Sequence, residues 1–192
     1  MNATTTPPAT LDSERADLLA ELAEARAALT RTTHGLTDAQ AGERPTVSEL
    51  CLGGLIKHAT SVEEGWLRFV VEGPSALSFD LPDGVTWADI ASGTARELPK
   101  WLIDRQDEFR MLPGETLDGV VKRYEQVAAR SDEVIAAIPD LSATHPLPEA
   151  PWSEPGRAWT ARRALLHIIA ETTQHAGHAD ILRETLDARK AA

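Results

Sequence analysis

The chain has 192 residues, a hydrophobic fraction of 42%, a formal net charge of −11 and a single cysteine. This length suits one domain with a substantial core, and the composition is typical of a soluble globular protein. The acidic balance and the absence of any Lys/Arg-rich block argue against nucleic acid or an anionic membrane as partner. The lone Cys51 excludes an internal disulfide, and no signal peptide or membrane-spanning run is recognisable. We therefore expect a cytoplasmic protein.

The N-terminal part predicts a tail followed by a helix. Residues 1–10 are rich in Thr and Pro, which offer little to bury, so we expect a disordered tail ahead of one domain over residues 11–190. Asp12 or Ser13 can cap a first helix that runs to about Thr33. Its Ala, Leu, Glu and Arg residues all favour the helical conformation.

A second helix is predicted from Thr46 or Ser48 to Gly73. His58 lies on its apolar face, and the broad apolar surface indicates a central position in the fold. Gly54 shares the side of His58 although it lowers helix stability by about 1 kcal/mol relative to Ala. Its bare backbone leaves room for another group to approach, or for close packing against a second helix.

Residues 74–114 form a long connection whose length indicates a crossover or a lid. Short helices are expected near 87–91 and 96–109 within it. Thr116 can then cap a third long helix to about Ile138, and no strand pattern follows. With the C-terminal helix described below, the chain is predicted to be all-α: a four-helix bundle with a long connection between helices 2 and 3.

The last helix, predicted over residues 159–189, carries His167, Glu171, His175 and His178. At about 100° per residue, these four side chains fall within roughly a quarter of the helix circumference. Apolar residues lie on or beside the same face, so the ionisable groups are expected to be buried. Burial without partners would cost several kcal/mol, so they need one another, a ligand or an ion.

The more specific interpretation of these ionisable residues is that they bind a metal ion. Glu171 and His175 are spaced i, i+4, so one helix face offers two ligands a single turn apart. Two histidines with one carboxylate leave coordination positions open, as in catalytic sites, and His58 is the candidate third ligand. Alternatively, His175 and His178 form the ligand pair with Glu171 as their hydrogen-bond partner. His167 is either a ligand or a hydrogen-bond donor behind the ligands.

Other residues receive simpler interpretations. His34 and His145 are predicted to be solvated surface residues, at a helix end and in a loop. Trp66, like the other four tryptophans, is expected to be a packing anchor, and it is also a candidate for the wall of a pocket. Leu166 and Ile169 point away from the ionisable face, so they meet a neighbouring helix or form the seam of a homodimer.

Three stretches of the chain carry a resemblance to a known family. Leu55-Ile56-Lys57-His58 leads to Trp66, Trp159-Thr160 opens the last helix, and the run HAGHADILRE closes the pattern from His175. Together they resemble the DinB-like superfamily of four-helix bundles. The similarity is greatest to the branch related to the N-terminal domain of mycothiol-dependent maleylpyruvate isomerase.

The resemblance implies a metal and a thiol. His58, Glu171 and His175 match the family's metal triad, which holds zinc or nickel with open positions. Relatives use the ion to activate mycothiol or bacillithiol, and a cation does lower the pKa of a thiol. We therefore expect a metal-dependent thiol S-transferase that acts on a small electrophilic substrate. The alternatives are a metal-dependent hydrolase and a non-catalytic bundle that binds a metal or small ligand.

Overall fold

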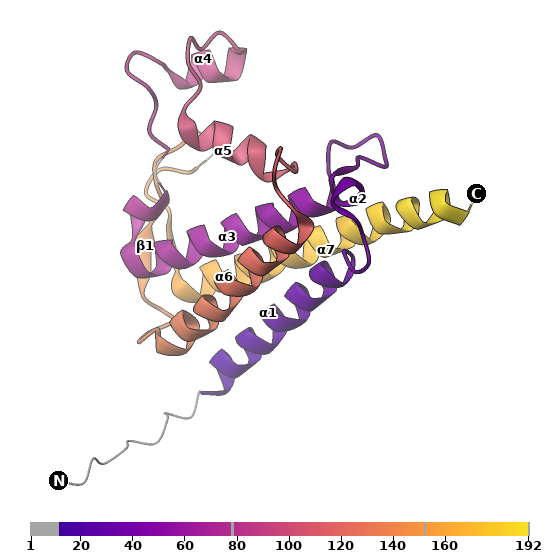
Figure 1. Ribbon diagram of the computed structural model, residues 1–192. Coiled ribbons are helices and arrows are strands. Elements are labelled where there is room, and N and C mark those ends of the chain that lie inside the picture. The colour runs from indigo at the N-terminus through magenta and orange to yellow at the C-terminus, as the bar shows by residue number, and fades with distance from the viewer. Residues whose placement is uncertain (1–11, 78, 152, 192) are drawn as a thin grey trace, which may run out of the picture.

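The computed structural model describes residues 12–77, 79–151 and 153–191, and Figure 1 shows its elements. The tail predicted for residues 1–10 lies outside the described residues. Four long helices form an all-α bundle, which confirms the predicted fold class. In chain order the elements are α1 (Ser13–Arg31), α2 (Asp38–Gly42), α3 (Leu52–Glu72), the 3-10 helix η1 (Pro74–Leu77), α4 (Trp87–Ser92), α5 (Lys100–Glu108), α6 (Leu117–Ala137), β1 (Thr144–Pro146), β2 (Ala158–Thr160) and α7 (Ala161–Ala191).

Helix α1 begins as expected and ends slightly early. The Asp12 side chain accepts a hydrogen bond from the backbone N–H of Arg15 and so caps the helix. The helix ends at Arg31 because the hydroxyls of Thr32 and Thr33 donate back to carbonyls of the last turn. Gly35 then takes a positive φ of 71°, which reverses the chain toward α2.

Helix α3 begins at Leu52, later than the predicted start at Thr46 or Ser48. The hydroxyls of those two residues instead accept backbone hydrogen bonds within a bend, which competes with helix formation. Cys51 is the actual cap, because its Sγ accepts from the backbone N–H of Gly54. Cys51 itself is buried, as a small apolar residue would be.

The core surrounds α3, which packs against both α6 and α7, while α1 lies along α7. One buried cluster includes Leu29 of α1, Leu55 of α3, Tyr124 of α6 and Ala179 of α7. A second cluster nearer the other end of the bundle includes Leu22, Leu67, Ile135 and Leu165. Each cluster thus contains residues from all four long helices, and α3 is central as predicted.

A buried ion pair also links the helices. The Arg26 guanidinium of α1 donates to both carboxylate oxygens of Glu63 of α3, at 2.6 and 3.1 Å, and Glu63 is fully buried. Arg26 donates in addition to Asp132 of α6 at 2.8 Å. Burial raises the pKa of the nearby Tyr124 hydroxyl, and the negative charge of Glu63 adds to the effect.

The connection between α3 and α6 leaves the bundle and returns across α3 (Figure 1). It carries α4 close to the predicted 87–91, whereas α5 is shorter than the predicted 96–109 because Pro99 is its cap. Where the connection returns, a Cβ added to Gly54 would lie 2.2 Å from the carbonyl oxygen of Phe109. The glycine is therefore required for backbone of the connection to approach α3, rather than for helix–helix packing.

The expectation of no strand was wrong in one place. Strands β1 and β2 pair antiparallel, with His145 opposite Trp159. At three residues each they are too short for alternating hydrophobicity to reveal them. Because β2 occupies residues 158–160, α7 begins at Ala161 and not at the predicted residue 159.

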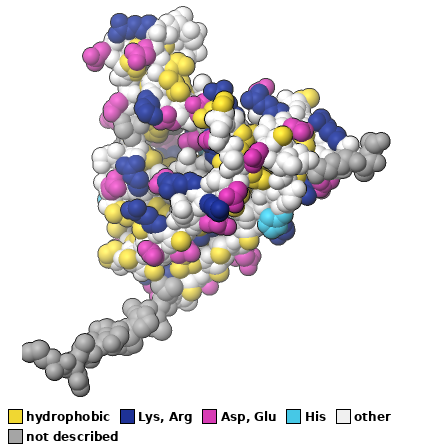
Figure 2. Space-filling model, in the orientation of Figure 1, with side chains coloured by type: hydrophobic (Ala, Val, Ile, Leu, Met, Phe, Trp, Pro, Cys, Tyr) yellow, Lys and Arg dark blue, Asp and Glu magenta, His cyan; other side chains and the backbone are white. Residues whose placement is uncertain are grey.

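Among the described residues, no helix is both long enough and apolar enough to cross a membrane. The face drawn in Figure 2 carries basic and acidic side chains interspersed with each other, and the segment containing α4 projects from the body.

Candidate metal centre

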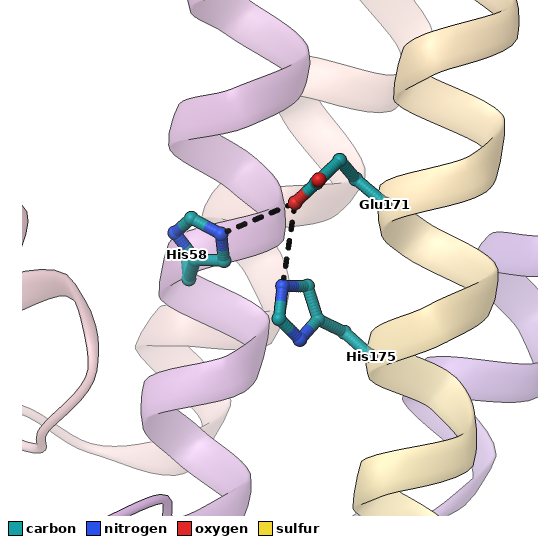
Figure 3. Close-up of side chains that lie close together, drawn as sticks. All are labelled: His58, Glu171 and His175. Atoms are coloured by element: carbon teal, nitrogen blue, oxygen red, sulfur yellow. Dashed lines mark ion pairs between the residues drawn. The ribbon is translucent and has the colours of Figure 1, made fainter. Parts of the chain in front are cut away.

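Three of the predicted residues come together between α3 and α7 (Figure 3). The Glu171 carboxylate lies 3.8 Å from Nε2 of His58 and 3.5 Å from Nε2 of His175. Each residue offers one ligand atom, and all three ligand atoms lie within 4.8 Å of one another. The i, i+4 spacing on α7 and the apolar face of α3 account for this convergence.

His58 is fully buried, and no hydrogen-bond partner for its Nε2 is present in the described part of the chain. An unsatisfied buried nitrogen costs roughly 1–3 kcal/mol, so such an atom requires an explanation. Its position opposite Glu171 and His175 gives one, because Nε2 is directed toward the same space as their ligand atoms (Figure 3).

His175 is held in its neutral form. Burial, together with the neighbouring His58, lowers its pKa from 6.5 to about 4, although Glu171 opposes the shift. A neutral imidazole has a lone pair to offer to a cation. The other ring nitrogen of His175, Nδ1, lies 3.4 Å from Nδ1 of His178. His178 therefore lies behind His175 and is not one of the three residues that converge.

Sequence reasoning missed Glu108, the last residue of α5. Its Oε2 accepts a hydrogen bond from Nδ1 of His58 at 2.9 Å. The ring of the next residue, Phe109, stacks on His58 with 4.2 Å between centroids. Both residues belong to the long connection, where no clear periodicity marks a buried face, so the sequence holds no signal for this contact.

His167 and Trp66 lie in an aromatic cluster beside the group of three. Trp66 stacks on Trp159 at 4.5 Å, and the His167 ring meets both indoles edge-on at 5.0 and 5.2 Å. Burial lowers the pKa of His167. His167 occupies the turn before Glu171, so the cluster continues the α7 face that carries the site.

The two remaining histidines differ from each other. His34 is exposed as predicted. The prediction for His145 was wrong, because the residue is half-buried, its Nε2 lies 3.2 Å from the Val70 carbonyl oxygen, and it packs edge-on against Phe69. The β-hairpin that the sequence did not reveal places His145 against the end of α3.

Leu166 and Ile169 were predicted to meet another helix or to form a dimer seam. Leu166 is 51% exposed, whereas Ile169 packs against the core cluster that contains Leu22. Ile169 therefore contributes to the bundle, and the homodimer stays a prediction.

A sequence profile of the mycothiol S-transferase family matches residues 17–188 of the chain. The chain belongs to the mycothiol S-transferase family. This family is DinB-like, so the resemblance inferred from the three stretches of sequence is confirmed. No curated protein sequence matches the chain significantly.

The donor set fits the metal that the DinB-like fold implies. Two imidazole nitrogens and one carboxylate oxygen suit zinc and related transition ions. Ligands bound to one ion at about 2.0–2.2 Å lie no more than about 4.4 Å apart. The two separations to the Glu171 carboxylate, 3.5 and 3.8 Å, satisfy that limit, and the two histidine nitrogens lie within 4.8 Å of each other, so a small movement of one ring completes the fit. The unsatisfied Nε2 of His58 supports the same fit.

An open surface hollow of about 450 Å³ is connected to the candidate metal centre through Phe109. Phe109 lines it and stacks on His58 as well, so one side chain contacts both the hollow and the site. The other lining residues come from the segment before α3, from α5 and from the residues just after α5: Arg44, Glu49, Leu50, Gln106 and Arg110.

Proposed function

We propose that this chain is a metal-dependent mycothiol S-transferase in which His58, Glu171 and His175 bind one divalent ion, zinc or nickel. The substrate is a small electrophile with a leaving group: the thiol gives its proton to solvent, its sulfur bonds to the electrophilic atom, and the leaving group departs with the electron pair of the bond that breaks. The observation that carries the proposal is the buried, unsatisfied Nε2 of His58 directed toward Glu171 and His175. Membership of the mycothiol S-transferase family supports the choice of thiol.

The charges of the three side chains suit an anionic sulfur. A bound divalent ion lowers the pKa of a thiol and stabilises the thiolate, which is the reactive nucleophile. His175 is neutral at physiological pH, and Glu171 is the one negative charge offered from α7. Two neutral imidazoles and one carboxylate leave about one positive charge on the ion and its three ligands, which favours a thiolate over a neutral thiol. The Glu108 carboxylate behind His58 offsets part of this charge.

Aromatic side chains limit the access of water. The Trp66, Trp159 and His167 cluster flanks the site along α7, and Phe109 covers one face of His58. Excluding water strengthens the interaction between a thiolate and the residual positive charge. The hollow lined by Phe109 is the proposed place for the substrate.

Metal content tests the ligand set. We expect about one divalent ion per chain in the wild type and a 10- to 100-fold or larger loss of affinity in His58→Ala and Glu171→Gln. His34→Ala is the matched control because His34 is an exposed histidine in the turn after α1 and is not one of the three proposed ligands. Elemental analysis and competition with a chromophoric chelator measure the outcome. Equal metal content in all four proteins would contradict the proposal.

Activity is a separate test of the reaction. A fluorescent electrophile is titrated with mycothiol, bacillithiol and glutathione, using metal-loaded and chelator-treated protein. We expect metal-dependent consumption of mycothiol with formation of the thioether, and loss of the rate in His58→Ala. If the metal-loaded chain produced no thiol adduct, the transferase function would be wrong and the binding or hydrolytic alternatives would replace it.

A further inference from the structure

The contact between Glu108 and His58 joins the long connection to the candidate metal centre. The two residues are 50 positions apart in the sequence, yet the Glu108 carboxylate lies 2.9 Å from Nδ1 of His58. The Glu108 side chain is 18% exposed and His58 is fully buried, so water does not readily replace this partner. The contact is therefore specific and not an incidental surface pairing.

Other interactions hold the end of α5 in place. Phe109 stacks on His58, and its carbonyl oxygen lies directly over Gly54. The Arg105 guanidinium lies 5.6 Å above the Phe109 ring and 3.7 Å from the Glu108 carboxylate. The position of Glu108 is thus fixed by the packing of α5 on α3.

We propose that Glu108 is a positioning residue for the metal centre, and this inference rests on the proposed metal binding by His58. A carboxylate only accepts hydrogen bonds, so Glu108 retains the proton of neutral His58 on Nδ1. The lone pair is then on Nε2, which is the nitrogen directed toward Glu171 and His175. Carboxylates behind metal-binding histidines fix the tautomer and ring orientation in this way.

The placement of Glu108 has a consequence for the connection between α3 and α6. Because the same carboxylate belongs to α5 and orients His58, metal binding and docking of α5 stabilise each other. Removing the metal is expected to increase hydrogen exchange over residues 100–110, and detaching α5 is expected to weaken metal binding.

The experiment compares zinc affinity in the wild type, Glu108→Ala, Glu108→Gln and the control Asp104→Asn. Asp104 is an exposed acidic residue one turn earlier on α5, where it pairs with Lys100. We expect a 10- to 100-fold loss in Glu108→Ala. Glu108→Gln retains most of the affinity because its amide oxygen accepts the same hydrogen bond, and Asp104→Asn binds zinc as the wild type does.

A second readout separates positioning from general stability. Long-range proton–nitrogen NMR of the metal-free wild type is expected to show His58 protonated on Nδ1, with a mixture of tautomers in Glu108→Ala. Wild-type protonation on Nε2, or unchanged zinc affinity in Glu108→Ala, would overturn the role of Glu108. If His58→Ala also retained zinc, the proposed metal site would itself be wrong, so the two failures are distinguishable.

Discussion

His175 illustrates how the environment of one residue sets its chemistry. An exposed histidine is partly protonated near neutral pH, but burial and the adjacent His58 lower the pKa of His175 to about 4. His178 and Arg105 add further repulsion, while Glu171 favours the protonated form. The ring is therefore neutral over the whole physiological range.

The lowered pKa of His175 predicts a pH dependence of stability in the metal-free chain. The unfolded state has the ordinary pKa of 6.5 and binds more protons than the native state between pH 6.5 and about 4. The free energy of unfolding should therefore fall as the pH drops through this window, by up to about 3 kcal/mol. Urea denaturation of chelator-treated protein at several pH values measures this slope.

The control for this pH dependence is His175→Asn, which removes the titrating ring. Its stability should fall less steeply than that of the wild type between pH 6.5 and 4.5. Parallel curves for the two proteins would show that His175 has no depressed pKa.

At the scale of elements, local sequence patterns predicted the long helices. The misplaced helix start is explained by side chains that hydrogen-bond to the backbone of a bend rather than to a helix end. In α1 and α6 the helix propensity of the residues, the spacing of the apolar positions and the capping residues all indicate the same helix. The predicted start of α3 was too early because the hydroxyls of Thr46 and Ser48, which could cap a helix, accept backbone hydrogen bonds within a bend. Cys51 is an unusual cap that propensity does not favour.

The candidate site could be predicted only where its signals are local. Glu171 and His175 share one helix face by spacing, and the apolar surroundings of His58 marked it as buried. Glu108 could not be found, because its contact joins residues far apart in sequence through a segment without periodicity. The Arg26–Glu63 pair was missed for a related reason, since charged residues in helices are normally solvated.

At the scale of the whole molecule, the buried ion pair connects three of the four long helices. Arg26 of α1 contacts Glu63 of α3 and Asp132 of α6. The Glu63 side chain is fully buried, whereas the Asp132 side chain is 51% exposed. The two carboxylates therefore offer the same charge to one guanidinium in very different surroundings.

This difference in burial predicts that removing the two carboxylates lowers the free energy of unfolding by different amounts. Glu63→Gln leaves the buried guanidinium with only the exposed Asp132 as charge partner, so we expect a loss of up to about 3–5 kcal/mol from the free energy of unfolding. Asp132→Asn should cost less than about 1 kcal/mol, because water screens an exposed pair. The first loss is a large part of the roughly 5–15 kcal/mol that typically stabilises a native protein.

Chemical denaturation of the metal-free proteins measures these losses. The double variant Arg26→Met/Glu63→Leu tests whether the loss in Glu63→Gln comes from the buried charge that remains on Arg26. Replacing both charges with apolar side chains should recover much of the stability lost in Glu63→Gln, because no charge then remains buried. Equal losses in Glu63→Gln and Asp132→Asn would contradict the assigned burial. Arg26 and Glu63 make no hydrogen bond or ion pair with His58, Glu171 or His175 in the described part of the chain, so variants that still fold should bind metal as the wild type does.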